Sequence, residues 1–309
     1  MLSDQMAYVA LVSADTAATS SVLERQLGLP RHDLGSAAGA IAVFSLGRSA
    51  LAVFPPAHPL VDGETKPGVH HIALGVDDLA AATARAAAAG IAGAAAGPGL
   101  AGRRCVTLDR SATVGVRTLL TERLDLKKHA GGPVERIDHV GVASADVFED
   151  ERVFTGTLGF PVESRQTDME VSMAVESFTS DKYGVVYHSR APEPVGGLRV
   201  YFITVGDCEL EFLANFDPRQ GAHAHERGRP GSTRQDQGAI ARFVTSRGQG
   251  LHHVAIKVTD IAATLTSMAG AGLPMIDVHG RPGSRRALIG FPHPGALGGV
   301  LMHLVQRDA

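Results

Sequence analysis

Three histidines and one glutamate occupy apolar stretches of the kind that form β-strands. They are His139 in HVGVA, Glu211 in CELEFL, His253 in HHVAIKV and His303 in VLMHLVQ. An imidazole or carboxylate on a buried sheet face is costly unless it is paired or bound to a metal. Imidazole nitrogens combined with a carboxylate suit divalent Fe, Co, Ni, Zn or Mn. We therefore interpret these four residues as ligands of one divalent metal ion.

Two internal repeats place the four residues at comparable positions. Ser-Ala-Asp at 13–15 recurs at 144–146, and Leu-Gly-x-Pro at 27–30 recurs at 158–161 with the same offset. A second repeat matches GVHHIALGVDD, which starts at Gly68, to GLHHVAIKVTD, which starts at Gly250. The chain is therefore expected to consist of four related modules.

Each module has the same order of predicted elements. An alternating apolar strand is followed by a Ser, Thr or Asp suited to cap a helix, then by a helix that ends at glycine, then by two or three strands. This order is βαβββ. The fold class is predicted as α+β, with the four modules paired into two cupped eight-stranded mixed sheets.

The domain prediction follows from this pairing. Modules 1–60 and 66–125 would form a degenerate domain, 1–125, and modules 134–217 and 249–309 a metal-binding domain, 134–309. The charged and then Gly/Pro-rich stretch between them, LDLKKHAGGPVE, is typical of a linker.

The two halves differ at the ligand positions. In the first half these positions hold Tyr8, Ala52, His71 and Leu119, and only His71 is a good metal ligand. The metal site is thus expected in the second half alone. Strand alternation predicts that the first histidine of each pair, His70 or His252, faces away from the site.

Composition excludes several classes of protein. The net charge is −3, aromatic residues make up 5% and Trp is absent, which argues against nucleic-acid binding. No long apolar run suggests a membrane partner or a leader segment. A cytoplasmic protein with a small-molecule substrate is expected, as a monomer or homodimer.

The sequence resembles the vicinal oxygen chelate superfamily, which includes glyoxalase I, extradiol dioxygenases and methylmalonyl-CoA epimerase. Residues 239–261 and 273–306 are similar to the epimerase branch, through AIARFVTSRGQGLHHVAIKVTDI and through the Phe-x-His-Pro and Gly-Gly-Val-Leu of the last module. The resemblance implies that His139, Glu211 and His253 are metal ligands. The chain departs from the family at His303, where glutamate is usual, and in the longer segment 164–197, which we expect near the mouth of the cup.

The chemistry implied is metal-assisted isomerisation or epimerisation, with an enolate or enediolate of a small carbonyl or acyl-CoA-like substrate as the intermediate. Candidate bases are Glu211, Glu176 and His188, and Arg285 and Arg286 are candidates for binding an anionic substrate group. One alternative is a non-haem Fe(II) dioxygenase of the extradiol or hydroxyphenylpyruvate type. A second is a protein that sequesters a ligand in the cup.

Overall fold

The computed structural model describes residues 1–127, 131–217 and 238–307. The first half contains β1 (Met6–Val12), α1 (Thr16–Ser21), β2 (Arg31–Ser36), β3 (Gly39–Leu46), β4 (Ser49–Phe54), β5 (Gly68–Val76), α2 (Leu79–Ala88), β6 (Gly97–Pro98), β7 (Arg104–Thr107) and β8 (Thr118–Glu122). The second half contains β9 (Val134–Ala143), α3 (Val147–Glu151), β10 (Val162–Ser172), β11 (Val175–Ser180), β12 (Gly184–Ser189), β13 (Glu193–Val205), β14 (Cys208–Phe216), α4 (Ala239–Arg247), β15 (Gly250–Val258), α5 (Ile261–Gly270), β16 (Arg281–Pro282), β17 (Leu288–Gly290) and β18 (Met302–Gln306).

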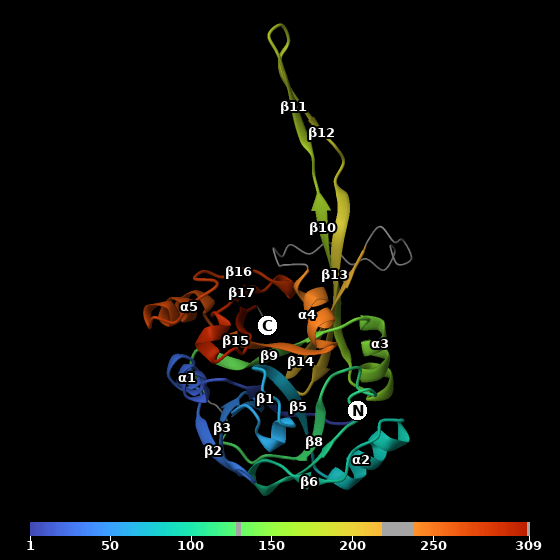
Figure 1. Ribbon diagram of the computed structural model, residues 1–309, viewed down its shortest axis with the longest axis vertical. Coiled ribbons are helices and arrows are strands. Elements are labelled where there is room, and N and C mark those ends of the chain that lie inside the picture. Colours follow the sequence, from blue (N-terminus) through green and yellow to red (C-terminus); the bar gives the residue numbers. More distant parts are fainter. Residues whose placement is uncertain (128–130, 218–237, 308–309) are drawn as a thin grey trace.

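The strands form two curled eight-stranded sheets of matching topology (Figure 1). The orders are β2-β3-β4-β1-β5-β8-β7-β6 and β10-β13-β14-β9-β15-β18-β17-β16. In each sheet two βαβββ modules meet through their antiparallel first strands, β1 with β5 and β9 with β15. The predicted α+β fold of four paired modules is confirmed.

Each module begins its helix at an aspartate, as the repeat predicts. The N-cap carboxylates are those of Asp15, Asp78, Asp146 and Asp260. Each accepts a hydrogen bond from a backbone N–H two or three residues further on, at 2.8–2.9 Å. The carboxylate satisfies a backbone N–H of the first helical turn that has no partner within the helix. The aspartate therefore marks the point where the chain leaves the first strand and begins the helix.

The two sheets pack against each other along β5 and β15, and one cluster of buried apolar side chains runs through both halves. We retain the division into two domains, separated between residues 125 and 134, as a proposal. Among the described helices, none is both long and apolar enough to span a bilayer.

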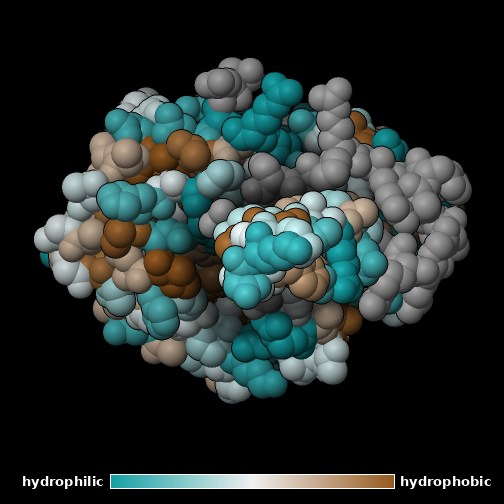
Figure 2. Space-filling model, turned by 90° about the horizontal axis from the view of Figure 1, so that it is seen from above, coloured by the Kyte–Doolittle hydropathy of each residue, from teal (hydrophilic) through white to brown (hydrophobic). Residues whose placement is uncertain are grey.

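The segment 164–197 lengthens β10 and β13 into a two-stranded arm that β11 and β12 extend (Figure 1). Its base adjoins the second sheet, whereas its far end projects well away from the body of the molecule (Figure 1). Several large apolar side chains on the arm are exposed, including Met173, Phe178 and Tyr187. Viewed from above, hydrophilic and hydrophobic residues are interspersed on the side toward which the arm projects (Figure 2).

A buried carboxylate lies where the two halves meet. Asp150 on α3 is fully buried, and its Oδ1 accepts a hydrogen bond from Gln249 Nε2 at 3.1 Å. The Oδ2 atom has no hydrogen-bond partner among the described residues. Burial raises the pKa of Asp150 to about 7, so ionisation of this group at neutral pH opposes folding.

The variant Asp150→Asn should therefore stabilise the protein in a pH-dependent way. The folded state holds the Asp150 proton more tightly than the unfolded state, so the wild type loses stability as pH rises from about 4, the usual Asp pKa, through about 7. We expect Asp150→Asn to raise the free energy of unfolding by about 1–3 kcal/mol at pH 8 and by little at pH 4. Urea unfolding at both pH values measures this difference, and an equal effect at both would contradict it.

Candidate metal centre

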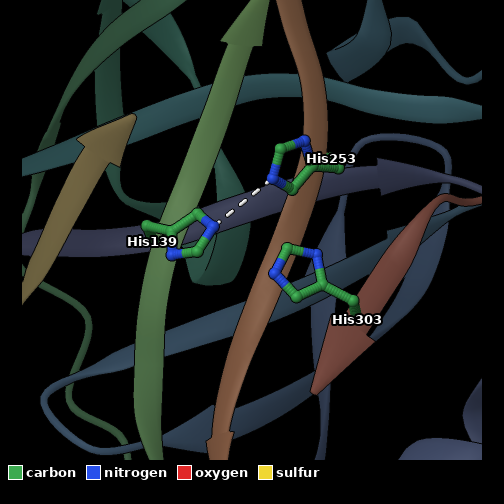
Figure 3. A group of neighbouring side chains, drawn as sticks. All are labelled: His139, His253 and His303. Carbon is green, nitrogen blue, oxygen red and sulfur yellow. Dashed lines mark hydrogen bonds between the residues drawn. The ribbon is translucent and has the colours of Figure 1, made fainter. Parts of the chain in front are cut away.

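Three histidine rings converge on the concave face of the second sheet (Figure 3). His139 comes from β9, His253 from β15 and His303 from β18, and one nitrogen of each lies within 4.8 Å of the others. Each residue is more than nine-tenths buried. Parallel pairing of β15 with β18 and antiparallel pairing of β9 with β15 bring these positions together from distant parts of the sequence.

The Glu211 carboxylate on β14 joins two of these rings. Its Oε2 lies 3.2 Å from His139 Nε2 and 3.2 Å from His253 Nε2, and the two nitrogens are 3.4 Å apart. Burial acts to raise the pKa of Glu211, but His139 and His253 outweigh it and hold the pKa well below the usual range. An ionised carboxylate and closely spaced imidazole nitrogens in a buried site make a donor set that fits a divalent cation.

Asp138 orients the His139 ring from behind. Its Oδ2 accepts a hydrogen bond from His139 Nδ1 at 2.9 Å, which leaves Nε2 of the neutral ring as a lone-pair donor directed toward Glu211. Two acceptor atoms facing each other at 3.2 Å require a proton or a metal cation between them. Without a metal, burial favours the neutral ring, but Glu211 and Asp138 raise the pKa of His139 to about 9. A carboxylate behind a ligating histidine is a common arrangement around metals in proteins.

Gly141 provides the space that the centre occupies. It lies opposite both Glu211 and His253 in the register of β9 with its neighbours. A Cβ atom at this position would lie 2.0 Å from His253 Cε1, so any larger residue would displace the ring. Sequence reasoning missed this residue, because a glycine within a strand does not reveal which side chain occupies the space beside it.

The centre forms one wall of a cavity of about 310 Å³. Apolar side chains make most of the remaining lining, among them Leu198, Phe202, Leu213, Ile240, Ile289 and Phe291. Phe291 also stacks on His303, with ring centroids 4.6 Å apart. An apolar cavity with polar groups at one end suits a small organic ligand that reaches the metal position through an oxygen.

The arginines of the last module have three different environments. Arg285 borders the cavity, but its guanidinium pairs with Asp138 at 2.6 Å and with Glu209 at 3.3 Å, and it stacks on Phe202. Arg286 is exposed and does not line the cavity. Arg281, which sequence reasoning missed, borders the cavity. Its Nε pairs with Asp277 at 3.2 Å, but its buried Nη1 has no hydrogen-bond partner in the described part of the chain. Arg281 is thus the arginine available to an anionic group in the cavity.

The structure corrects the orientation expected for His252. The pairing of β15 with β9 shifts register between Leu251 and His253, and this irregularity interrupts the alternation of side chains. His252 consequently borders the same cavity as His253, and their Nδ1 atoms lie 3.0 Å apart. Burial, followed by the neighbouring His253, lowers the pKa of His252 to about 3.

Two of the bases considered from the sequence lie far from the cavity. Glu176 on β11 and His188 on β12 face each other across the arm, both exposed, with Glu176 paired to Arg190 at 2.7 Å. Neither borders the cavity, because the inserted strands extend outward instead of folding over its mouth. Glu211 is the candidate base that the fold places at the centre.

The corresponding face of the first sheet is filled with apolar side chains. Tyr8, Ala52 and Leu119 belong to one buried cluster there, and His71 is fully buried beside it. His71 Nε2 lies 3.3 Å from the Tyr8 hydroxyl. His71 is therefore a hydrogen-bonded residue of a packed core. The other three repeat positions in this half hold neither an imidazole nor a carboxylate.

The paired βαβββ modules carry imidazoles on the concave face of their shared sheet. This arrangement defines a class of proteins that act on small molecules, and comparison with known proteins places the chain in that class. Two family models, both described as glyoxalase/bleomycin resistance protein/dioxygenase superfamily, match residues 138–291 and 5–103. The chain belongs to this superfamily, whose members are mostly metal-dependent enzymes and to which the vicinal oxygen chelate resemblance pointed.

Individual relatives include enzymes of two kinds. Mouse mitochondrial methylmalonyl-CoA epimerase is 25% identical over 130 residues, which are 42% of this chain and 64% of the relative, so the chain spans less than two thirds of its length. A mutant of 4-hydroxymandelate synthase from Streptomyces coelicolor matches with a TM-score of 0.61 at 18% identity, covering 100% of this chain and 94% of that one. Methylmalonyl-CoA epimerase from Mycobacterium tuberculosis matches with a TM-score of 0.39 at 22% identity, covering 59% and 93%.

Proposed function

We propose that the protein is a metal-dependent isomerase or epimerase acting on a small carbonyl or acyl-CoA-like substrate. His139, Glu211, His253 and His303 would hold one divalent ion of Fe, Co, Ni, Zn or Mn. The observation that carries this proposal is the convergence of three buried imidazoles, with the Glu211 carboxylate 3.2 Å from two of them.

The number of ligands favours isomerisation over oxygen chemistry. Four protein ligands would leave fewer open positions on a divalent ion than three, but enough for one or two oxygens of a substrate. The facial triad of two histidines and one carboxylate leaves three positions, which lets a non-haem iron take up oxygen beside a chelating substrate. The additional imidazole in this chain supports the first arrangement.

Different residues of the chain would have different roles in proton transfer. A bound ion would supply Lewis-acid stabilisation of negative charge on a substrate oxygen. Glu211, which lies 3.2 Å from two imidazole nitrogens, would accept a proton from the carbon beside that oxygen if its carboxylate leaves the ion. Arg281 Nη1 would bind an anionic substituent, and the apolar lining would exclude water from the reacting carbon.

Solvent exchange tests the proposal. The purified protein, reconstituted in turn with each of the five metals, is incubated in D₂O with 2-substituted acyl-CoA thioesters and α-hydroxycarbonyl compounds. We expect metal-dependent deuterium incorporation at the α-carbon of one substrate class. NMR measures this incorporation. Chelation should abolish this incorporation, and metal should restore it.

Oxygen uptake provides the opposing result. Substrate-dependent oxygen consumption that requires Fe(II), without α-carbon exchange, would overturn the proposal in favour of an extradiol- or hydroxyphenylpyruvate-type dioxygenase. Tight binding of a ligand with neither exchange nor oxygen uptake, unaffected by metal, would favour a sequestering protein.

A further inference from the structure

A second cavity, of about 240 Å³, lies between the two halves of the molecule. Its walls come from the start of β5, the start of β15, the end of α4 and the stretch 110–117. His70 and His252, the first histidines of the duplicated phrase, both border it. The two copies of that phrase therefore meet at one cavity.

Basic side chains dominate this cavity. Lys66, Arg110, Arg117 and Arg247 border it, together with a single carboxylate, Glu64. Glu64 lies 3.7 Å from Arg117, which leaves the other three basic groups without a carboxylate partner among the described residues. The cavity thus has an excess of positive charge.

The surroundings of Lys66, Arg110 and Arg247, the three basic groups without a carboxylate partner, fit a negatively charged ligand. Arg110 donates to the backbone carbonyls of Gly115 and Gln249 at 2.8 and 3.0 Å, which anchors its guanidinium between the two halves. Burial, and then the charge of Arg117, lower the pKa of Arg110. Arg247 stacks on Phe243 and donates to the backbone carbonyl of Pro67 at 3.4 Å, whereas the Lys66 ammonium has no partner within the described chain. Positive groups that border one cavity without enough carboxylates to balance them are stabilised by a bound anion.

His70 offers a neutral donor to the same ligand. The residue is 4% exposed, and its Nε2 has no hydrogen-bond partner within residues 1–127, 131–217 and 238–307. Burial raises the pKa of Tyr8, so its hydroxyl keeps its proton, and His71 Nε2 is the acceptor available at 3.3 Å. His71 then carries its proton on Nδ1 and donates to His70 Nδ1 at 2.8 Å, which leaves the His70 proton on Nε2.

We propose that this cavity between the halves binds a small anion bearing a phosphate or diphosphate group. Arginine and lysine recognise the oxygens of phosphate by charge-assisted hydrogen bonds, and the N–H of a neutral imidazole adds a further donor. The volume of about 240 Å³ is large enough for a polyatomic anion. The proposal is independent of the proposed isomerase activity, because the cavity does not include His139, His253, His303 or Glu211.

Calorimetric titration of the full chain with pyrophosphate tests the proposal. We expect saturable binding, weakened on the order of 10-fold by Lys66→Gln and similarly by Arg247→Gln, because each removes one charge-assisted contact. Lys66 is the preferred position because its side chain has no described partner whose loss would disturb folding. The charge-conserving variant Lys66→Arg should bind pyrophosphate with an affinity within about threefold of the wild type.

Controls separate this cavity from the metal centre and from general charge. Arg103→Gln removes an exposed positive charge that does not border the cavity, and it should leave binding unchanged. Coenzyme A, titrated in parallel, identifies the source of the phosphate. If Lys66→Gln weakens the binding of coenzyme A and of pyrophosphate equally, the site is assigned to a nucleotide-bearing substrate. If it weakens the binding of pyrophosphate alone, the site is assigned to a free phosphorylated molecule.

Two results would overturn the proposal. One is the absence of saturable pyrophosphate binding to the wild-type chain. The other is binding of the same strength in wild type, Lys66→Gln and Arg247→Gln, which would place the anion elsewhere, at the metal centre for example.

Discussion

Replacing His253 with alanine should lower the affinity for divalent metal by more than about 100-fold. The imidazole Nε2 lies 3.4 Å from that of His139 and 3.2 Å from Glu211 Oε2, so its removal deletes one donor and opens the buried centre to water. Elemental analysis after dialysis and competition with a chromophoric chelator measure the loss. Metal-dependent exchange of a substrate proton should disappear with the metal.

The internal repeat supplies a matched control for this experiment. His71 occupies the corresponding position of the first sheet, and His71→Ala should leave metal content unchanged in the folded protein, because Tyr8, Ala52 and Leu119 surround that position. His303→Glu should retain metal, since a carboxylate replaces an imidazole at the same strand position. Metal binding that is lost equally in His71→Ala and His253→Ala would contradict the assignment of the centre to the second half.

Asp138→Ala should reduce the free energy of unfolding by about 3–5 kcal/mol, the usual cost of removing one partner from a buried ion pair. Asp138 is fully buried and accepts hydrogen bonds from Arg285 at 2.6 Å, from Arg307 at 3.0 Å and from His139. Burial acts to raise its pKa, but His139, Arg285 and Arg307 outweigh it and hold the pKa well below the usual range. Without the carboxylate, the Arg285 and Arg307 guanidinium groups would keep only Glu209 and, for Arg285, the exposed Glu163 at 3.6 Å as carboxylate partners.

Urea unfolding of matched variants measures this effect. Asp77→Ala removes a carboxylate that also pairs with an arginine, Arg123, but in an exposed position where solvent screens the interaction. Its unfolding midpoint should therefore stay close to that of the wild type. Asp138→Asn keeps the shape of the residue and should weaken metal binding by about 10–100-fold through His139. Similar midpoints for Asp138→Ala and Asp77→Ala would show that the buried network does not stabilise the fold.

Repetition made the architecture predictable from the sequence. The recurrence of Ser-Ala-Asp and of the His-His phrase defines four modules, and each module repeats a strand, an aspartate cap and a helix. These features are local, because strand alternation and helix capping depend on residues a few positions apart. The difference between the halves was also visible, since the positions of Tyr8, Ala52 and Leu119 hold groups that do not ligate metals well.

The chemical surroundings of the centre depended on the tertiary structure. Arg285 was expected to face a substrate, yet it pairs with Asp138, while Arg281 borders the cavity with a free donor. The inserted segment projects as an arm and carries Glu176 and His188 away from the centre. The partner of Arg285 lies 147 residues away in the sequence, so the local pattern contains no information on it. The local pattern likewise does not give the direction in which the insertion projects.

The doubled His-His phrase illustrates both contributions. The sequence by itself determined that the two phrases are equivalent first strands and that the second copy, with His253, is the one accompanied by other ligands. Only the tertiary structure decided the position of the first histidine of each pair. The register shift in β15 and the packing of β5 against β15 bring His70 and His252 to one cavity between the halves. Strand alternation predicts a face only for regular pairing, and an irregularity in register is determined by the neighbouring strand.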